Sequence, residues 1–157
     1  MEPRKLGVPK LSRIQKYKHI VRDVFYGEAF VKRKPEAYDD IVAQDVLVHD
    51  PGVPGLEHKG LDKLKNIARS FWAAFPDIVV DIQYVLGEGN LVVIYYNATG
   101  TLTREFQGTQ PTGKKFQSPG VEMFRFSKGK IVEIWAVDDT LGMMQQLNLV
   151  PAKLSPQ

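Results

Sequence analysis

The hydrophobic pattern of this chain changes at Pro76, and that change limits what its 157 residues can fold into. Before Pro76, apolar residues recur every three or four positions, as they do on one face of a helix. After it, β-branched and aromatic residues alternate with other residues, as in strands that are buried on one side. A run of helices followed by a run of strands predicts an α+β domain whose helices cover one face of a sheet.

Three helices are predicted before this change. The first begins after Ser12, which forms a capping-box pattern with Gln15, and it ends at the basic run 32–34. The second is short and runs from Pro35, a residue suited to the first helical position, to about Ala43. The third spans residues 61–75, where a broad apolar stripe repeats at intervals of three and four.

Five strands and a last short helix complete the prediction. Turn sequences at 87–90, 110–113 and 127–129 join the later strands into an antiparallel meander. A curved sheet capped by helices encloses a cone-shaped space in which a small molecule can bind. The strands are expected at 45–49, 78–86, 91–106, 115–126 and 130–137, and the last helix at 140–148.

Composition and charge narrow the class of protein. Hydrophobic residues make up 43% and charged residues 25%, which is ordinary for a globular domain. Residues 1–34 carry ten Lys or Arg against three acidic residues, but no nucleic-acid motif accompanies them, so we expect neither nucleic acid nor membrane as a partner. The absence of cysteine excludes a disulfide framework and a cysteine metal site. Because the first thirty residues contain no continuous apolar region and no apolar run is long enough to span a membrane, we expect a cytoplasmic protein. We divide the chain into a flexible basic arm, 1–11, one domain, 12–150, and a tail, 151–157.

Several short segments resemble the SnoaL-like polyketide cyclase or ester cyclase family in their order and spacing. The resemblance covers roughly residues 14–148 and is strongest where the last strand enters the last helix. The segments are Phe75-Pro76-Asp77, Gly87-Glu88-Gly89-Asn90, Thr99-Gly100-Thr101, Phe106-Gln107-Gly108, Pro111-Thr112-Gly113-Lys114, and Gly129-Lys130-Ile131-Val132-Glu133 followed by Trp135, Asp139 and Gly142.

This resemblance implies both a fold and an activity. The fold is a cystatin-like, NTF2-like α+β cone, with a curved antiparallel sheet wrapped around about three N-terminal helices and a short C-terminal helix. The resemblance further implies a homodimer, an enclosed hydrophobic pocket, and neither a metal nor an organic cofactor. Characterised members close a polyketide ester by an intramolecular aldol reaction, with an aspartate as general acid and base.

The chain departs from the family at two ionisable positions. Alignment places Ala136 where the cyclases have their aspartate and Leu102 where many of them have a histidine. The same alignment places Glu122 where certain cyclases have a histidine, and Asp50 where some members have a pocket amide. Their structural alternatives are a solvent-facing acid for Glu122 and a turn residue before a proline for Asp50.

Two adjacent acids follow the last strand. Side chains two apart on a strand share a face, so Ile134, Ala136 and Asp138 are expected to face the same way, with Asp138 about 7 Å beyond Ala136. Asp138 is therefore the candidate proton shuttle, although it is equally suited to capping the last helix. For Asp139 the cap is the preferred interpretation.

The remaining candidates are a histidine and a set of apolar and aromatic residues. His49, at a strand end, has the pKa range for proton transfer, but a structural histidine is the more common case. Core packing explains most of the aromatic residues, while Tyr96 has a hydroxyl that suits a substrate oxygen. The candidate substrate-binding residues are Trp72, Phe75, Tyr96, Leu102, Phe124, Ile134 and Ala136.

Three functions follow from this pattern. The first is a cofactor-free cyclase or isomerase that acts on a hydrophobic carbonyl compound. The second keeps the fold and opens an epoxide or moves a double bond. The third is a binding or accessory protein without catalysis, which the residues Ala136 and Leu102 favour. The histidines lack metal-ligand spacing, so no metal site is expected.

Overall fold

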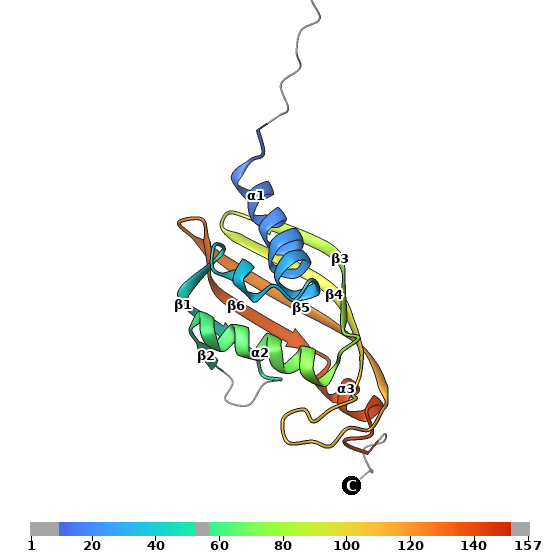
Figure 1. Cartoon of the computed structure of the whole chain (residues 1–157). Coiled ribbons are helices and arrows are strands. Elements are labelled where there is room, and N and C mark those ends of the chain that lie inside the picture. The colour runs from blue at the N-terminus through green and yellow to red at the C-terminus, as the bar shows by residue number, and fades with distance from the viewer. Residues whose placement is uncertain (1–9, 53–56, 152–157) are drawn as a thin grey trace, which may run out of the picture.

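The computed structural model describes residues 10–52 and 57–151, in which helices cover one face of a curved six-stranded sheet (Figure 1). The strand order is β2-β1-β6-β5-β4-β3. This is the predicted α+β arrangement, with its helices on the concave side and a short helix after the last strand. Most of the predicted arm and tail, residues 1–9 and 152–157, lies outside the described residues.

The first helix changes its hydrogen bonding partway along. Helix α1 (Arg13–His19) begins with the predicted capping box, since Ser12 and Gln15 bond each other's backbone N–H groups. The chain then continues as a π-helix, η1 (Ile20–Val31), where a regular α-helix was predicted. A π-helix takes more residues per turn, so apolar spacing at three and four does not distinguish the two forms.

The second predicted helix is shorter than expected, and the third is confirmed. Only one 3₁₀ turn, η2 (Pro35–Tyr38), forms at the second position. The chain then enters β1 (Val42–His49), three residues before the predicted strand start, because Val42 is fully buried and pairs with Ile131. Helix α2 (Leu61–Ala74) buries its predicted stripe and ends just before Pro76.

The sheet is mixed, so the prediction of a wholly antiparallel sheet is wrong in one place. Strands β3 to β6 form the predicted antiparallel meander, but β1 pairs with β6 in parallel. Alternating apolar residues identify a strand without identifying its neighbour, which is why this pairing was missed. The other strands are β2 (Glu57–Lys59), β3 (Val79–Glu88), β4 (Leu91–Thr101), β5 (Lys115–Ser127) and β6 (Lys130–Asp138), followed by helix α3 (Thr140–Gln146).

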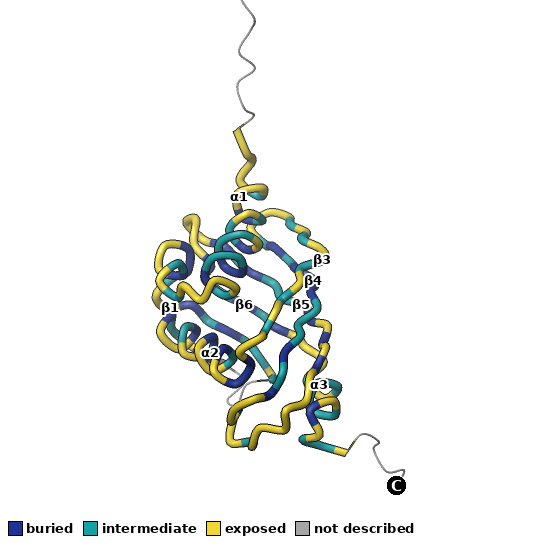
Figure 2. Tube along the Cα trace, turned by 45° about the vertical axis from the view of Figure 1, so that its right-hand side comes forward, coloured by how far each residue is buried: buried dark blue, intermediate teal, exposed yellow. Residues whose placement is uncertain are grey.

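Irregular pairing accompanies the curvature of this sheet. The register shifts between Ile82 and Tyr84 in β3 and between Arg125 and Phe126 in β5, and such irregularities bend a strand and increase its twist. Beside the second shift, in the turn just before β4, the side-chain amide of Asn90 donates to the Phe126 carbonyl oxygen at 3.1 Å. The buried segments of the strands lie beneath the helices (Figure 2).

Strand β4 ends earlier than predicted, at Thr101 instead of Phe106. The chain leaves the sheet there and returns at Lys115, and Phe106 forms an isolated bridge with Thr109 inside this loop. Phe106 packs under the loop against Phe75 with ring centroids 5.2 Å apart. The β-rich composition of residues 102–106 thus made the predicted strand too long, because Phe106 is buried beneath the loop and not within the strand.

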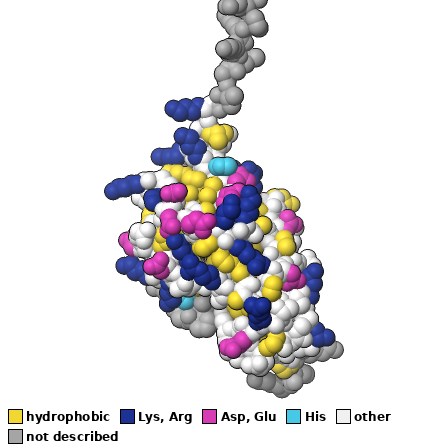
Figure 3. All heavy atoms as spheres, in the orientation of Figure 1, with side chains coloured by type: hydrophobic (Ala, Val, Ile, Leu, Met, Phe, Trp, Pro, Cys, Tyr) yellow, Lys and Arg dark blue, Asp and Glu magenta, His cyan; other side chains and the backbone are white. Residues whose placement is uncertain are grey.

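The surface in Figure 3 carries Lys and Arg side chains interspersed with Asp and Glu over the helix-bearing face. This view shows no large area of a single charge. None of the described helices combines the length and apolar character needed to cross a membrane.

His58, in β2, is a buried polar residue without a hydrogen-bond partner among the described residues. It is 2% exposed, and neither ring nitrogen has such a partner. Because burying an unsatisfied polar group costs about 1–3 kcal/mol, we expect His58→Leu to raise the free energy of unfolding by about 1 kcal/mol. Urea denaturation measures this change. His19→Leu, on exposed α1, is the control and should give no increase; a loss of stability in His58→Leu would contradict the prediction.

Candidate functional site

A cavity of about 290 Å³ lies between the helices and the concave face of the sheet. Helices η1 and α2 form one wall, strands β4 to β6 form the other, and the loop after β4 and helix α3 border the space. The wall is mostly aromatic and aliphatic, which suits a hydrophobic ligand. The aromatic residues that line it are Phe25, Tyr26, Phe30, Tyr38, Phe71, Tyr96, Phe106 and Phe116.

Three carboxylates line this cavity: Asp50, Glu122 and Asp138. Asp50 follows β1, Glu122 lies within β5, and Asp138 ends β6. Alternation along the strands brings the last two inward, because Glu122 shares a face with buried Phe124 and Asp138 shares a face with Ile134. Glu122 pairs with Ala136 across the strands, so Asp138 lies diagonally from Glu122, about 7 Å away at the level of the side-chain bases.

Glu122 is held by a tyrosine from the opposite wall. The hydroxyl of Tyr26, a buried residue of η1, donates to Glu122 Oε2 at 2.6 Å. Burial raises the pKa of the Glu122 carboxyl to about 8, with the negative charges of Asp138 and Asp50 acting in the same direction. Hydrogen bonding by Tyr26 and Tyr96 opposes this rise without cancelling it. Glu122 is therefore largely protonated at neutral pH.

Asp138 lies at the rim of the cavity and is held by a second tyrosine. The Tyr96 hydroxyl, from β4, donates to Asp138 Oδ1. Burial of the Asp138 carboxyl against the surrounding protein raises its pKa. The hydrogen bond from Tyr96 lowers this pKa, and the negative charge of Asp50 raises it. Because Asp138 as a whole residue is exposed to solvent, we expect its pKa to rise less than the pKa of Glu122.

Gly120 makes the bond between Tyr96 and Asp138 possible. It lies in β5 between the two, pairing with Tyr96 on one side and with Asp138 on the other. A side chain at this position would overlap the Tyr96 ring and the Asp138 carboxylate. The tyrosine and the aspartate therefore meet over a strand that presents only backbone beneath them.

Asp50 occupies the turn that leads away from β1. Its Oδ1 accepts a hydrogen bond from the Gly52 backbone N–H at 2.8 Å, which is the turn role expected from the sequence. The residue also lines the cavity, and its charge acts on both Glu122 and Asp138. Strands β1 and β6 are parallel, so Asp50 and Asp138 come from the same end of two neighbouring strands.

The other predicted binding residues separate into two groups. Tyr96, Ile134 and Ala136 line the cavity. The structure places four others in the core and not among the described lining residues. Of these, Trp72 and Phe124 belong to the main core, and Phe75 and Leu102 belong to a second core around the end of α2.

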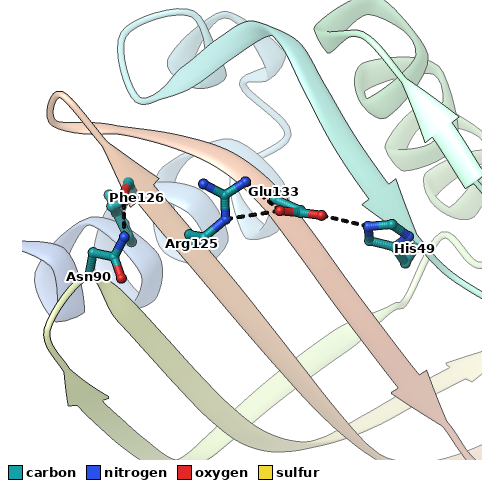
Figure 4. Close-up of polar contacts among 5 residues, drawn as sticks. All are labelled: His49, Asn90, Arg125, Phe126 and Glu133. Carbon is teal, nitrogen blue, oxygen red and sulfur yellow. Dashed lines mark hydrogen bonds and ion pairs between the residues drawn. The ribbon is translucent and has the colours of Figure 1, made fainter.

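His49 lies on the other face of the sheet, away from the cavity. Its Nε2 is 2.8 Å from Glu133 Oε1, and Arg125 bonds the same carboxylate, so the three side chains form a row across β1, β6 and β5 (Figure 4). Its ring also stacks on Trp135, with centroids 5.3 Å apart. Asp139 caps α3, as predicted, and accepts a hydrogen bond from the Gly142 backbone N–H at 2.9 Å.

Sequence reasoning missed several lining residues. Tyr26 was not singled out because apolar spacing does not show which face of a π-helix is inward. Met143 and Met144 line the cavity from α3, where only an amphipathic pattern was visible. A glycine in a strand, as at Gly120, is the one signal that was available, since it often marks a close approach of other groups.

No set of three or more His, Cys, Asp or Glu side chains within residues 10–52 and 57–151 is arranged to hold a metal ion. The polar side chains among the described lining residues are carboxylates, phenols, aliphatic hydroxyls and the amide of Gln107. Such groups transfer and orient protons.

Comparisons with known proteins identify the fold and the family of this chain. A comparison with curated protein sequences gives no match. Among solved structures, IdmH from Streptomyces antibioticus, a proposed polyketide cyclase, is 30% identical, with a TM-score of 0.70 over 85% of this chain and 99% of that one. A proposed polyketide cyclase from Acidithiobacillus ferrooxidans is also 30% identical, with a TM-score of 0.75 over 88% of this chain and 99% of that one.

TsrD from Streptomyces laurentii is more distant in sequence, at 18% identity, and shows the fold alone. Its TM-score is 0.76 over 90% of this chain and all of that one, 100%. The family model described as SnoaL-like polyketide cyclase matches residues 20–147, which contain every carboxylate and tyrosine of the cavity. The chain therefore belongs to the SnoaL-like polyketide cyclase family.

Proposed function

We propose that this protein is a cofactor-free acid–base catalyst that acts on a hydrophobic carbonyl compound as a cyclase or isomerase. One observation carries the proposal: two carboxyl groups, Glu122 and Asp138, face one apolar cavity and are each held by a tyrosine. Groups whose surroundings push their pKa values apart are suited to opposite roles in proton transfer. Membership of the family supports a reaction of this class.

Glu122 is the proposed proton donor. With its pKa raised to about 8, the carboxyl is mostly neutral at physiological pH and is able to donate to a carbonyl oxygen. The Tyr26 hydroxyl donates to Oε2, so the proton is placed on Oε1. Proton donation to the carbonyl oxygen is needed because the described lining residues include no Lys, Arg or His that would stabilise a negatively charged enolate.

Asp138 is the proposed base. The hydrogen bond from Tyr96 favours its ionised form, and the rim position gives it water as a second source of stabilisation. In the proposed reaction, Asp138 takes the proton beside the carbonyl while Glu122 protonates the oxygen, which gives an enol. The enol carbon then attacks a second carbonyl of the same molecule. The enol hydroxyl returns its proton to Glu122 as its carbonyl re-forms, and Asp138 gives its proton to the new alkoxide oxygen, which becomes a hydroxyl group.

The diagonal arrangement provides room for this reaction. Ala136, directly opposite Glu122, is the position that aligns with the family aspartate, and its small side chain leaves the strand surface open. Asp138 supplies a carboxylate one step further along the same face. The proposed base is thus displaced by two residues from the aspartate of the family pattern.

A ligand-binding protein without catalysis is the second candidate function. Ala136 and Leu102 favour it, because both replace an ionisable group of the family. Leu102 is fully buried in the second core, so it has no route to a substrate there. Homodimer formation also stays a proposal drawn from the family resemblance.

Loss of the base provides the first test of this function. In heavy water, we expect the wild-type protein to accelerate exchange of the protons beside the carbonyl of 2-acetylnaphthalene or a related polycyclic ketone. Asp138→Asn should lower that exchange rate by about 100-fold or more, since general-base catalysis contributes about 10²–10⁴. Proton NMR follows the exchange.

Asp139→Asn is the matched control, because asparagine also caps a helix and Asp139 is not among the described lining residues. It should keep the wild-type rate. Full exchange in Asp138→Asn would exclude the proposed base. No acceleration by the wild-type protein over a panel of such ketones would favour the binding function instead.

The raised pKa of Glu122 predicts how stability depends on pH. The folded protein binds the proton of the Glu122 carboxyl more tightly than the unfolded chain does, because the pKa of this carboxyl has its ordinary value of 4.5 in the unfolded chain. The contribution of Glu122 to the free energy of unfolding is therefore fully present below about pH 4.5 and is lost as pH rises through about 8. We expect Glu122→Gln to flatten this decline in the free energy of unfolding, and urea titrations at several pH values measure it. An unchanged slope would show that Glu122 has an ordinary pKa.

The close approach at Gly120 provides a structural test of the site. Gly120→Ala should separate Tyr96 from Asp138 and lower the free energy of unfolding by about 1–3 kcal/mol, as overpacking does. Gly27→Ala in η1 is the control, because its methyl group would lie 3.4 Å from the nearest backbone oxygen, an ordinary contact. Urea denaturation of both variants gives the comparison, and equal stabilities would contradict the assigned packing.

A further inference from the structure

We propose that the substrate of this cavity is elongated, with a carbonyl head beside Glu122 and Asp138 and an apolar alkyl or acyl tail that extends toward helix α3. The inference rests on the proposed function, since it names the class of substrate for the same cavity. We call the part of the cavity that holds the tail the tail subsite. Its described lining residues include Val80, Ala98, Phe106, Phe116, Met143 and Met144.

The cavity is long and narrow. Glu122 and Phe116 both line it, and they lie six residues apart on the inward face of β5. Since a strand rises about 3.3 Å per residue, the space extends about 20 Å along this strand. A volume of about 290 Å³ spread over such a length suits an extended molecule better than a compact ring system.

The carboxyl groups occupy one end of this length. Glu122 is at that end, and Asp138 pairs with Gly120, the next inward residue of β5. Asp50 follows β1, which pairs with β6 before β6 ends at Asp138. From there α3 lies beside the beginning of β5, and the described lining residues of this second part carry no charge. A carbonyl head therefore has its partners at one end, and the rest of the molecule lies against an uncharged wall.

The hydroxyl groups of the tail subsite already have partners. Ser118, which is buried, donates to the Asp139 backbone carbonyl oxygen at 3.2 Å. The Thr109 hydroxyl donates to the Phe106 backbone carbonyl oxygen at 2.5 Å. The amide of Gln107 belongs to an exposed residue, so water reaches it. An apolar tail thus fits here without leaving a buried polar group unsatisfied.

Helix α3 presents methionine side chains to the tail subsite without covering them. Met143 and Met144 line the cavity, although none of the residues Thr140–Gln146 is buried. The helix is fixed in this place, because the Gln146 amide accepts from the Gln117 backbone N–H at 2.9 Å and donates to the Gln117 carbonyl oxygen at 3.0 Å. Methionine is flexible and adapts to apolar groups of different shape. A tail against α3 would cover apolar surface that the described protein leaves partly uncovered.

Aromatic rings form the far wall of the subsite. Phe106 and Phe116 each pack against the buried ring of Phe75, with centroids 5.2 Å apart in both pairs. Phe71 of α2 lies 5.0 Å from Phe106 between ring centroids. The tail subsite is therefore bounded by the second core, which limits the length of the tail.

The binding test uses acetophenones that differ only in the group at the 4′ position: methyl, ethyl, butyl and 2-methoxyethyl. In isothermal titration calorimetry, the affinity should rise about threefold for each methylene group added between methyl and butyl, because each one is buried. The 2-methoxyethyl group matches butyl in length but places an ether oxygen in the subsite, so this probe should bind about tenfold more weakly. Equal affinities for these two probes, or no binding of the butyl probe, would overturn the proposal.

Methionine methyl groups report where the tail lies. The chain has four methionines, and Met123 lies on the opposite face of the sheet because it follows inward-facing Glu122 in β5. With isotope-labelled methionine methyl groups, NMR should show NOE contacts from the butyl tail to Met143 and Met144 and none to Met123. Contacts to Met143 and Met144 from the acetyl group, and not from the tail, would show the reverse orientation and contradict the inference.

A tryptophan in the subsite provides an independent readout. Met144→Trp fills part of the space, so it should reduce the advantage of the butyl probe over the methyl probe from about 30-fold to about threefold or less. Leu141→Trp places the same ring on the same helix, at a residue that is 48% exposed and not among the described lining residues, and it should leave the advantage intact. Thermal melting shows whether each variant is folded. A full advantage in folded Met144→Trp would exclude a tail against α3.

The outcome is separable from that of the proposed function. Asp138→Asn should keep the preference for the butyl probe while it loses the proton exchange. If the ketones undergo catalysed exchange but the butyl group gives no advantage, the acid–base function stands and the inference fails. If the butyl probe binds best and no ketone exchanges, the protein is a receptor for ketones with apolar tails, without the proposed catalysis.

Discussion

The hydrogen bond from Tyr96 to Asp138 crosses Gly120, and the candidate site depends on that crossing. Three neighbouring strands contribute one residue each, and the middle one must lack a side chain for the outer two to meet. This contact fixes Asp138 at the rim, on the face shared with Ile134 and Ala136. It also fixes the diagonal arrangement of Asp138 and Glu122 on the cavity wall.

Burial then gives the two carboxyl groups different properties although their chemistry is the same. Glu122 lies against η1 and is held by a buried phenol, so its neutral form is favoured. Asp138 is reached by solvent, so its ionised form is less disfavoured. In the proposed function, this difference in depth is what makes one carboxyl the acid and the other the base, and it depends on the curved sheet and the helices that cover it.

Much of this fold is predictable from the chain, because burial on one side leaves a period in the sequence. The stripe that ends at Phe75 predicted α2, and alternation before Asp138 predicted which way that residue faces. Pairing between distant strands leaves no such local pattern, so the parallel neighbours β1 and β6 were not foreseen. Tyr26 was missed for a related reason, since its partner Glu122 is 96 residues away.

The parallel pairing of β1 with β6 affects how the chain behaves while it is being synthesised. Residues 42–49 leave the ribosome long before residues 130–138, so β1 waits for its neighbour through most of translation. During that time its apolar residues, Val42, Val46 and Val48, have no strand on that side. Unpaired apolar edges invite association with other chains. The pairing of β6 with β1 therefore completes the cavity wall and covers the exposed edge of β1 in the same late step.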